Sequence, residues 1–278
     1  MGTKVICIAP EGQVIDQSIV DTVNFQINAV KKSDCGRILH IMSPQPKSAV
    51  NMEVEGLDVF ILNADAPPPK LLLADMDSTI VQSETLDDLA AHFDIQDKVA
   101  AITERAMRGE MDFHEALRAR VSMLKGLPEA AIFDLLPNIK LSAGAESLIY
   151  TCKKNDVKTY LVSSGFTHVT GYIAEKLGFD GHFGNRFVIS DGVLTGDVVE
   201  PIQDKTAKLR ILNELCEVHD ITPDEVVAVG DGANDIPMLQ AAGYGVAYRA
   251  KPAVIAATDM GIVHTDLSAV GGLYLHNY

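Results

Sequence analysis

The 278-residue sequence is poor in cysteine, lacks clustered histidines and has no long apolar segment. We expect the cysteines to be reduced interior residues, because they show neither C-x-x-C nor zinc-ligand spacing. They are Cys7, Cys35, Cys152 and Cys216. The eight histidines form no H-E-x-x-H or similar cluster. No apolar run approaches the roughly 20 residues of a membrane span, and the first residues open no signal peptide. A cytoplasmic protein is therefore expected.

Positive charge is also scarce. The sequence has 23 Lys and Arg residues against 38 Asp and Glu residues, a formal net charge of −15. This balance argues against nucleic acid or an anionic membrane as the main partner. An anionic ligand would need positive charge concentrated locally, from a metal ion, Lys, Arg and backbone N–H groups. The hydrophobic fraction of 47% indicates a globular protein of one or two domains.

An apolar run at 71–74 ends in Asp75 and Asp77, after a proline-rich linker at 65–69. Such a short, uninterrupted run predicts a strand buried on both faces, as in a parallel sheet. Ligands bind at the carboxyl ends of strands in open α/β sheets, which is where both acids would lie. Two carboxylates this close repel each other unless a cation lies between them, and a divalent metal ion is the simplest candidate. The alternative is that Asp75 begins a turn and residues 78–79 cap a helix.

A second apolar run, at 225–230, is also followed by acids. Asp231 and Asp235 follow it, before a helical pattern at 236–242. Two buried strands that each end in a pair of acids favour a ligand site over an ordinary turn.

A third predicted strand, at 158–162, ends in small residues. Ser163, Ser164 and Gly165 follow it, and a helix begins near Thr167. The free N–H groups and the dipole at a helix N-terminus attract anions. Alone this tripeptide would be an ordinary loop, but a strand, a small-residue turn and a helix N-terminus in sequence form a potential anion site.

Residues 85–140 have a helical pattern. Their apolar residues form three stripes: Leu86, Leu89 and Phe93; Val99, Ile102 and Ala106; and Phe113, Leu117, Val121 and Leu124. Arg120 falls between Phe113 and Leu117 on the third stripe, whereas Arg118 points away from it. An unpaired buried cation is costly. Arg120 therefore either forms a salt bridge or extends to the edge of the stripe, or it reaches a substrate carboxylate.

The remaining elements are predicted from the same patterns. A small α+β unit combines strands at 5–9, 37–42 and 57–62 with a helix at 17–31. Further along, the patterns predict a helix at 143–154, a hairpin within 186–200, a helix at 206–216 and strands at 244–248 and 261–263.

Four motifs occur in the order DMDST (75–79), VSSGF (162–166), AKLRIL with Lys208, and GDGAND (230–235). Together they resemble the haloacid dehalogenase superfamily, most closely its phosphoserine phosphatase branch, from Leu71 to the C-terminus. The resemblance implies an α/β fold with a Rossmann-like core, a parallel sheet and a helical cap inserted after the first core strand. A small N-terminal α+β domain precedes them. Residues 1–66 lie outside the resemblance and form the N-terminal domain expected from their patterns; the implied domains are 67–84 with 141–278 (core) and 85–140 (cap).

The resemblance also implies a reaction, the Mg²⁺-dependent hydrolysis of O-phospho-L-serine to L-serine and phosphate. Asp75 would attack phosphorus and form an aspartyl-phosphate. Asp77 would give a proton to the leaving alkoxide and later take one from water. The side chains of Asp75 and Asp231 and the backbone carbonyl of Asp77 would hold Mg²⁺. Asp235 would help to hold the metal site without binding the metal directly.

Other roles implied by the resemblance concern the substrate. Ser163 and Lys208 would hold the phosphoryl oxygens, although Lys208 is chosen over the neighbouring Lys205 only by its motif. Asn234 would orient the substrate. Glu84 and Arg120 would bind the ammonium and carboxylate groups of phosphoserine.

One motif departs from the family. The family usually has Ser-Gly-Gly where this chain has Ser163-Ser164-Gly165. Serine tolerates positive φ less well than glycine, so a backbone contact from Ser164 to the substrate depends on its conformation.

Several interpretations remain open from the sequence. The pair Glu84 and Arg120 would also fit phosphothreonine or phosphohomoserine. A haloalkanoic dehalogenase needs no metal and leaves Asp77, Asp231 and Asp235 without a role. A cation-pumping ATPase needs membrane spans. Residues 1–66 look loosely like the regulatory amino-acid-binding domains fused to such phosphatases. They could equally be a pairing element of a homodimer, or the basis of a non-catalytic sensor.

Overall fold

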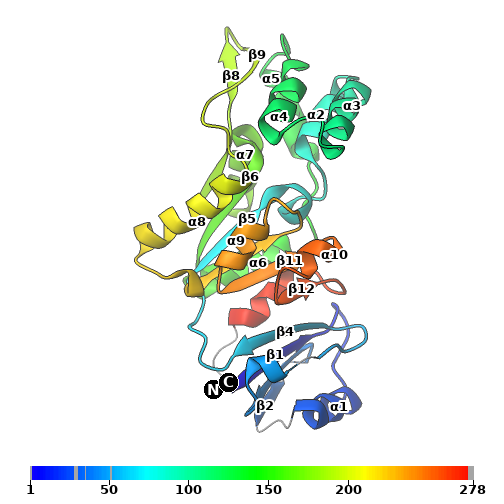
Figure 1. Cartoon of the computed structure of the whole chain (residues 1–278), viewed down its shortest axis with the longest axis vertical. Helices are drawn as coiled ribbons and strands as arrows, with labels where there is room; N and C mark the ends of the chain where they lie inside the picture. Colours follow the sequence, from blue (N-terminus) through cyan, green and yellow to red (C-terminus); the bar gives the residue numbers. More distant parts are fainter. Residues whose placement is uncertain (1, 28–30, 35, 51, 275–278) are drawn as a thin grey trace. The chain divides into compact units, whose positions relative to one another are not determined.

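The computed structural model describes residues 2–27, 31–34, 36–50 and 52–274. Its strands are β1 (Thr3–Ile8), β2 (Lys31–Asp34), β3 (Ile38–Ser43), β4 (Asp58–Asn63), β5 (Leu71–Asp75), β6 (Lys158–Phe166), β7 (Gly181–Asn185), β8 (Phe187–Ser190), β9 (Val193–Val198), β10 (Val226–Gly230), β11 (Tyr244–Tyr248) and β12 (Met260–Ile262). Its helices are α1 (Gln17–Ile27), α2 (Thr85–His92), α3 (Gln96–Met107), α4 (Phe113–Ser122), α5 (Ala130–Leu135), α6 (Ala145–Lys154), α7 (Thr167–Leu177), α8 (Lys205–His219), α9 (Ile236–Ala241) and α10 (Pro252–Ile255) (Figure 1). Short helical turns lie at Lys47–Ala49, Met76–Ile80, Leu136–Asn138, Pro223–Glu225 and Leu267–Tyr274.

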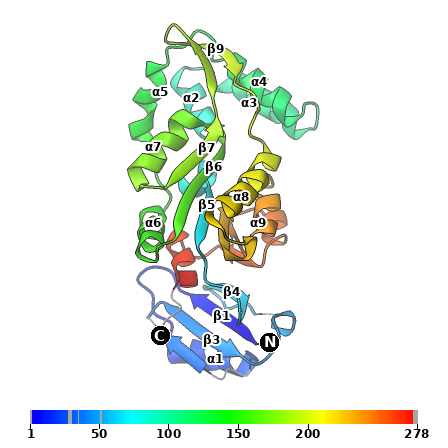
Figure 2. The ribbon, with the colours of Figure 1, turned by 90° about the vertical axis from the view of Figure 1, so that its left-hand side faces the viewer.

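A six-stranded sheet forms the α/β core, in the order β12-β11-β10-β5-β6-β7. The pairs β10–β11, β11–β12 and β6–β7 are parallel, and Figure 2 shows β5, β6 and β7 side by side. Every residue of β5, β10 and β11 is buried, as strands covered on both faces must be. The predicted α/β fold with a parallel sheet is confirmed.

The chain divides into two compact units. Unit 1 comprises Met1–Leu73, Ala143–Thr159 and Leu212–Tyr278, and unit 2 comprises Ala74–Ser142 and Tyr160–Ile211. The division into an N-terminal domain, a core and a cap stays a prediction. In the part of the chain that the structure describes, no helix combines the length and the apolar character that crossing a membrane requires.

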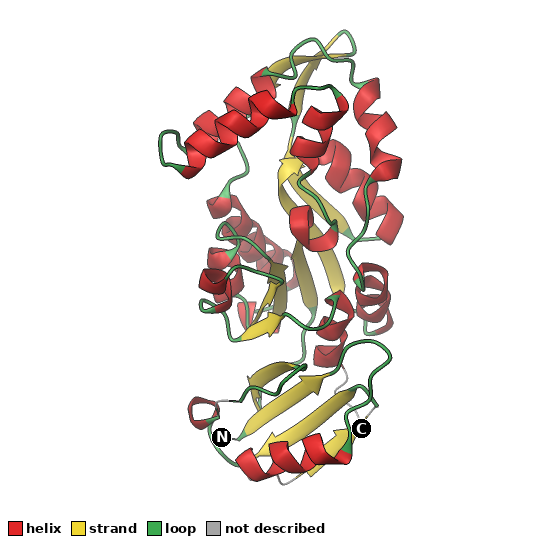
Figure 3. Ribbon diagram, turned by 90° about the vertical axis from the view of Figure 1, so that its right-hand side faces the viewer, coloured by secondary structure: helices red, strands yellow, loops and turns green. Residues whose placement is uncertain are grey.

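Unit 1 contains an antiparallel sheet in the order β2-β3-β1-β4. Helix α1 covers one face of this sheet (Figure 3), and the two share an apolar core that includes Val5, Val23 and Leu39. Three cysteines, Cys7, Cys152 and Cys216, are free and buried as predicted; Cys35 lies outside the described residues.

The helix predicted at 17–31 is too long, and strand β2 was missed. The helix ends at Ile27, residues 28–30 lie outside the described residues, and Lys31 already begins β2. Strand β2, with the sequence Lys-Lys-Ser-Asp, has no apolar alternation and lies at the edge of the sheet. Backbone pairing with β3 forms this strand, and hydrophobic periodicity contains no sign of such pairing.

A buried carboxylate joins the first residue of β4 to the segment after β12, within unit 1. Asp58 is 2% exposed. It accepts hydrogen bonds from the backbone N–H groups of Val263 (2.9 Å), His264 (3.0 Å) and Thr265 (2.9 Å), and from the Thr265 hydroxyl. This single side chain therefore satisfies three consecutive buried or partly buried backbone donors.

Replacing Asp58 by Ala should lower the free energy of unfolding by about 2–4 kcal/mol, because those donors lose a charged acceptor. Urea unfolding followed by circular dichroism measures the change. The matched control is Asp65→Ala, an exposed aspartate of the same unit. Equal stability losses in both variants would contradict the role given to Asp58.

Unit 2 contains helices α2 to α5, and the hairpin β8–β9 packs with them. Leu117, Val121 and Leu194 belong to one apolar cluster. The backbone of the hairpin bonds to the segment after α4, from Gly126 N to Leu194 O at 2.8 Å and from Leu194 N to Leu127 O at 2.9 Å. The hairpin lies beside α4 and α5 in Figure 1.

The third apolar stripe is only partly buried. Leu117, Val121 and Leu124 are buried, but Phe113 is 38% exposed. The prediction that Phe113 belongs to a buried stripe is therefore wrong. It is the first residue of α4, and its ring contacts the edge of the neighbouring His114 ring.

Candidate active site

Asp75, the last residue of β5, lies against a buried lysine. Lys208 Nζ is 2.5 Å from Asp75 Oδ1, and the two side chains are 1% and 6% exposed. Lys208 lies in the first turn of α8, whereas Lys205 on the same turn is exposed. The structure thus brings Asp75 and Lys208 together, 133 residues apart in the sequence.

Asp77 is held by hydrogen bonds from two other segments of unit 2. Its Oδ1 accepts from the backbone N–H (2.9 Å) and the hydroxyl (2.7 Å) of Thr85, and its Oδ2 accepts from the Ser163 hydroxyl at 2.7 Å. Ser163 Oγ in turn accepts from Gly165 N at 2.7 Å. A Cβ at Gly165 would lie 2.9 Å from Asp77 Oδ2, so only glycine fits without a shift. Thr85 was not predicted, because no motif distinguishes it from other residues that begin a helix.

The backbone around Ser164 is extended. Ser164 lies within β6 and outside the residues with positive φ, so serine at this position is not strained. Its carbonyl accepts a hydrogen bond from Asn185 Nδ2 at 2.7 Å, and Asn185 Oδ1 accepts from Gln203 N at 2.7 Å. The buried Asn185 was not predicted, since it ends the short, glycine-containing strand β7 that the sequence patterns did not identify.

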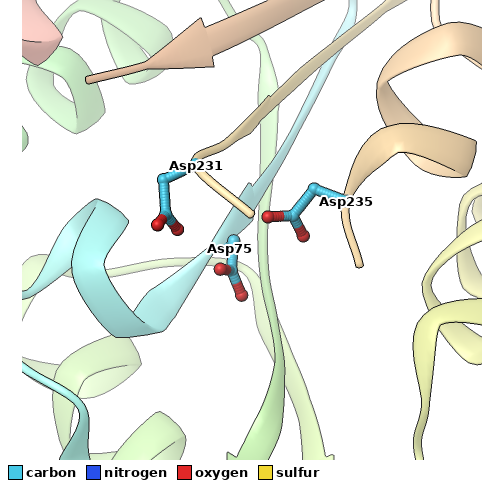
Figure 4. A group of neighbouring side chains, drawn as sticks. All are labelled: Asp75, Asp231 and Asp235. Atoms are coloured by element: carbon cyan, nitrogen blue, oxygen red, sulfur yellow. The ribbon is translucent and has the colours of Figure 1, made fainter. Parts of the chain in front are cut away.

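Three carboxylates meet at the ends of β5 and β10. Asp75, Asp231 and Asp235 each offer an oxygen within 4.8 Å of the others, and Asp75 and Asp235 are buried. Figure 4 shows the three carboxylate groups close to one another. Asp235 Oδ2 accepts from Gly232 N at 3.0 Å. A Cβ at Gly230 would lie 2.5 Å from Asp235 Cγ, so this glycine leaves the space that Asp235 fills.

Asn234 is half-buried in the same turn. Its Oδ1 lies so close to Gly232 that a Cβ on Gly232 would be 2.2 Å from it. Asp231 and Asp235 each place an oxygen within 4.8 Å of an Asp75 oxygen, although the family resemblance implies only a supporting role for Asp235. The side chain of Asp77 instead binds Thr85 and Ser163.

This donor set fits a hard divalent cation. All its ligand atoms are carboxylate oxygens, which Mg²⁺ prefers. Lys208 contributes one positive charge beside three carboxylates, so a bound cation would relieve repulsion that remains.

Arg120, on α4, interacts with a second group of acidic side chains in unit 2. Its Nε is buried and has no hydrogen-bond partner within the described residues. Burial lowers the pKa of Arg120, and the carboxylates of Asp87, Glu84 and Asp77 oppose that shift. Glu84 is exposed at the start of α2, and its Oε1 accepts from Ser78 Oγ at 3.0 Å.

Asp87 was not predicted as part of this group. Burial raises its pKa, with Arg120 opposing the shift. Asp87 lies on the polar side of α2. The sequence pattern at such a position does not indicate that a buried arginine lies nearby.

Comparison with known proteins identifies the family. Residues 69–243 match the family model described as haloacid dehalogenase-like hydrolase. The chain belongs to this haloacid dehalogenase-like family. A curated relative, the phosphoserine phosphatase of Archaeoglobus fulgidus, is 43% identical over 198 residues, which are 71% of this chain and 58% of the relative. The chain spans only about half of the first curated relatives that it matches.

Two solved structures share the haloacid dehalogenase-like fold and more than 30% of the sequence. A probable phosphoserine phosphatase from Vibrio cholerae is 32% identical with a TM-score of 0.82, covering 98% of this chain and 86% of that one. A phospho-aspartyl intermediate analogue of phosphoserine phosphatase is 39% identical with a TM-score of 0.67, covering 73% of this chain and 98% of that one.

Lys208→Met should lower the free energy of unfolding by about 3 kcal/mol, because it leaves the buried Asp75 without its cation. Thermal and urea unfolding at pH 7 measure the effect. Lys205→Met, on the exposed side of the same turn, should change stability by about 0.5 kcal/mol or less. A similar loss of stability in both variants would mean that the Asp75–Lys208 pair contributes little to the free energy of unfolding.

Proposed function

We propose that this protein is a Mg²⁺-dependent phosphatase that hydrolyses O-phospho-L-serine to L-serine and phosphate, the last step of serine biosynthesis. The observation that carries the proposal is the buried Asp75, with Lys208 Nζ at 2.5 Å and two further carboxylates within 4.8 Å. Relatives named phosphoserine phosphatase match this chain at about 40% identity. A phosphoenzyme route is supported by the 39% identical structure that is described as a phospho-aspartyl intermediate analogue.

The metal ligands in this proposal are the side chains of Asp75 and Asp231 and the backbone carbonyl of Asp77, supported by Asp235. The bound Mg²⁺ would offset the repulsion between an anionic nucleophile and a phosphate dianion. A carboxylate is ionised at neutral pH, so Asp75 needs no base before it attacks phosphorus.

The other groups of the site stabilise the transferring phosphoryl group and move protons. Lys208 Nζ and the Ser163 hydroxyl bind phosphoryl oxygens, where charge builds in the transition state. Asp77 gives its proton to the leaving serine oxygen and then accepts one from the attacking water. Thr85, through its two hydrogen bonds to Asp77 Oδ1, fixes the orientation of that carboxyl group. Asn234 orients the substrate.

The choice of phosphoserine rests on Glu84 and Arg120. An acid and a cation close enough to interact suit an amino acid, which carries an ammonium and a carboxylate group. The buried Arg120 Nε, with no hydrogen-bond partner among the described residues, supports its assignment to the substrate carboxylate. Phosphothreonine and phosphohomoserine carry the same two groups and remain alternative substrates. A cytoplasmic location, a homodimer and a regulatory role for residues 1–66 stay predictions.

Asp75→Asn should reduce Mg²⁺-dependent phosphate release from phosphoserine by at least about a thousandfold, because the amide cannot attack phosphorus. A colorimetric phosphate assay, with and without excess chelator, measures it. Asp197→Asn, at an exposed position of β9, is the control and should retain full activity. Undiminished hydrolysis in chelator would refute the metal dependence, and an active Asp75→Asn variant would refute the nucleophile.

Arg120→Ala should raise KM for phosphoserine by about 10- to 100-fold, because the substrate carboxylate loses one pair of charge-assisted hydrogen bonds. KM for p-nitrophenyl phosphate, which has no carboxylate, should stay close to that of the unmodified protein. Steady-state kinetics with a panel of phosphorylated amino acids gives both values. Arg118→Ala removes an exposed cation two residues away and should leave the preference unchanged. Equal KM changes for the two esters would exclude Arg120 from carboxylate recognition.

A further inference from the structure

A single carboxylate in unit 2 contacts two helices that carry proposed substrate-binding groups. Asp204 Oδ1 accepts hydrogen bonds from Thr206 N (2.8 Å), the Thr206 hydroxyl (2.6 Å) and Ala207 N (3.2 Å), at the start of α8. Its Oδ2 lies 3.1 Å from His114 Nε2, in the first turn of α4. The two oxygens of Asp204 therefore bind different helices.

We propose that Asp204 is a positioning residue that couples the phosphate-binding helix α8 to the carboxylate-binding helix α4. The proposal rests on the proposed function, in which Lys208 on α8 binds the phosphoryl group and Arg120 on α4 binds the substrate carboxylate. Lys208 directly follows the Ala207 amide that Asp204 binds. Arg120 lies six residues after His114, about 9 Å along the helix at 1.5 Å per residue.

The first turn of α4 is fixed independently of this link. Glu115 N donates to Asp112 Oδ1 at 2.8 Å, and Asp112 N donates to Glu115 Oε2 at 3.0 Å, which is a complete capping box. A rigid α4 transmits the position of His114 to Arg120. The contact between His114 and Asp204 therefore sets how far Arg120 lies from Lys208.

The environment of Asp204 keeps it ionised. Burial acts to raise its pKa, but the hydrogen bonds from Thr206, His114 and the amides of Thr206 and Ala207 outweigh it and lower the pKa to about 2. Two further charged groups, Arg118 and Glu200, bind each other at 2.5 Å, and Glu200 interacts electrostatically with His114. The Arg118–Glu200 pair also joins α4 to the segment before α8, but it does not contact the first turn of α8.

The coupling has a specific consequence for substrates. Phosphoserine must reach Lys208 and Arg120 at the same time, so it depends on the spacing of the two helices. An ester such as p-nitrophenyl phosphate needs only the phosphate-binding groups. Loss of the contact between His114 and Asp204 should therefore weaken the binding of phosphoserine and leave the hydrolysis of the aryl ester unaffected.

The test compares His114→Ala with Glu200→Gln, which removes the other charged contact of α4. For His114→Ala we expect KM for phosphoserine to rise about fivefold, with kcat/KM for p-nitrophenyl phosphate within about twofold of the unmodified protein. Glu200→Gln should change neither value by more than about twofold. Equal losses on both esters, an equal effect of Glu200→Gln, or no change in His114→Ala would each overturn the proposal.

A second measurement needs no substrate. Amide hydrogen exchange of His114→Ala should be about fivefold faster at Thr206 and Ala207, because Asp204 loses the partner that holds it in its capping position. Unchanged exchange at these amides would overturn the coupling. If the unmodified protein released no phosphate from phosphoserine, the proposed function would fail, while faster exchange in His114→Ala would still show the link between the helices.

Discussion

The crowding of negative charge at the end of β5 is the constraint on which the site depends. Two unit charges about 4 Å apart repel by roughly 4 kcal/mol at an effective dielectric constant of about 20. Asp75 meets two further carboxylates within 4.8 Å, and it is buried. The Lys208 ammonium at 2.5 Å makes such a position tolerable. A parallel sheet provides the setting, since it brings the ends of β5 and β10 together and excludes water from both strands.

Much of this arrangement could be predicted from the sequence, because it follows from local patterns. The apolar runs at 71–74 and 226–230 indicate strands buried on both faces, and the acids after them must lie at the same edge of a parallel sheet. The small residues at 163–165 and the lysine at 208 follow from the motif order. The structure brings Ser163 to Asp77 and Lys208 to Asp75.

Other residues could not be found this way, because their partners are distant in the sequence. Asp58 binds residues about 206 positions later, and Asn185 binds the backbone at 164 and 203. An isolated Asp or Asn carries no periodicity, so nothing local separates it from a surface residue. Strand β2 was missed for a related reason, since its backbone pairing with β3 leaves no trace in the hydrophobic periodicity.

The hairpin β8–β9 adds two backbone connections to helices α2 to α5. Residues 187–198 pack with these helices through Leu194, yet they lie between β7 and α8 in the chain. These helices and the hairpin are therefore joined to the rest of unit 2 by four stretches of main chain, near 84, 141, 186 and 200, where a simple insertion would have two. Separating them from the rest of unit 2 would require backbone rotations in all four connections.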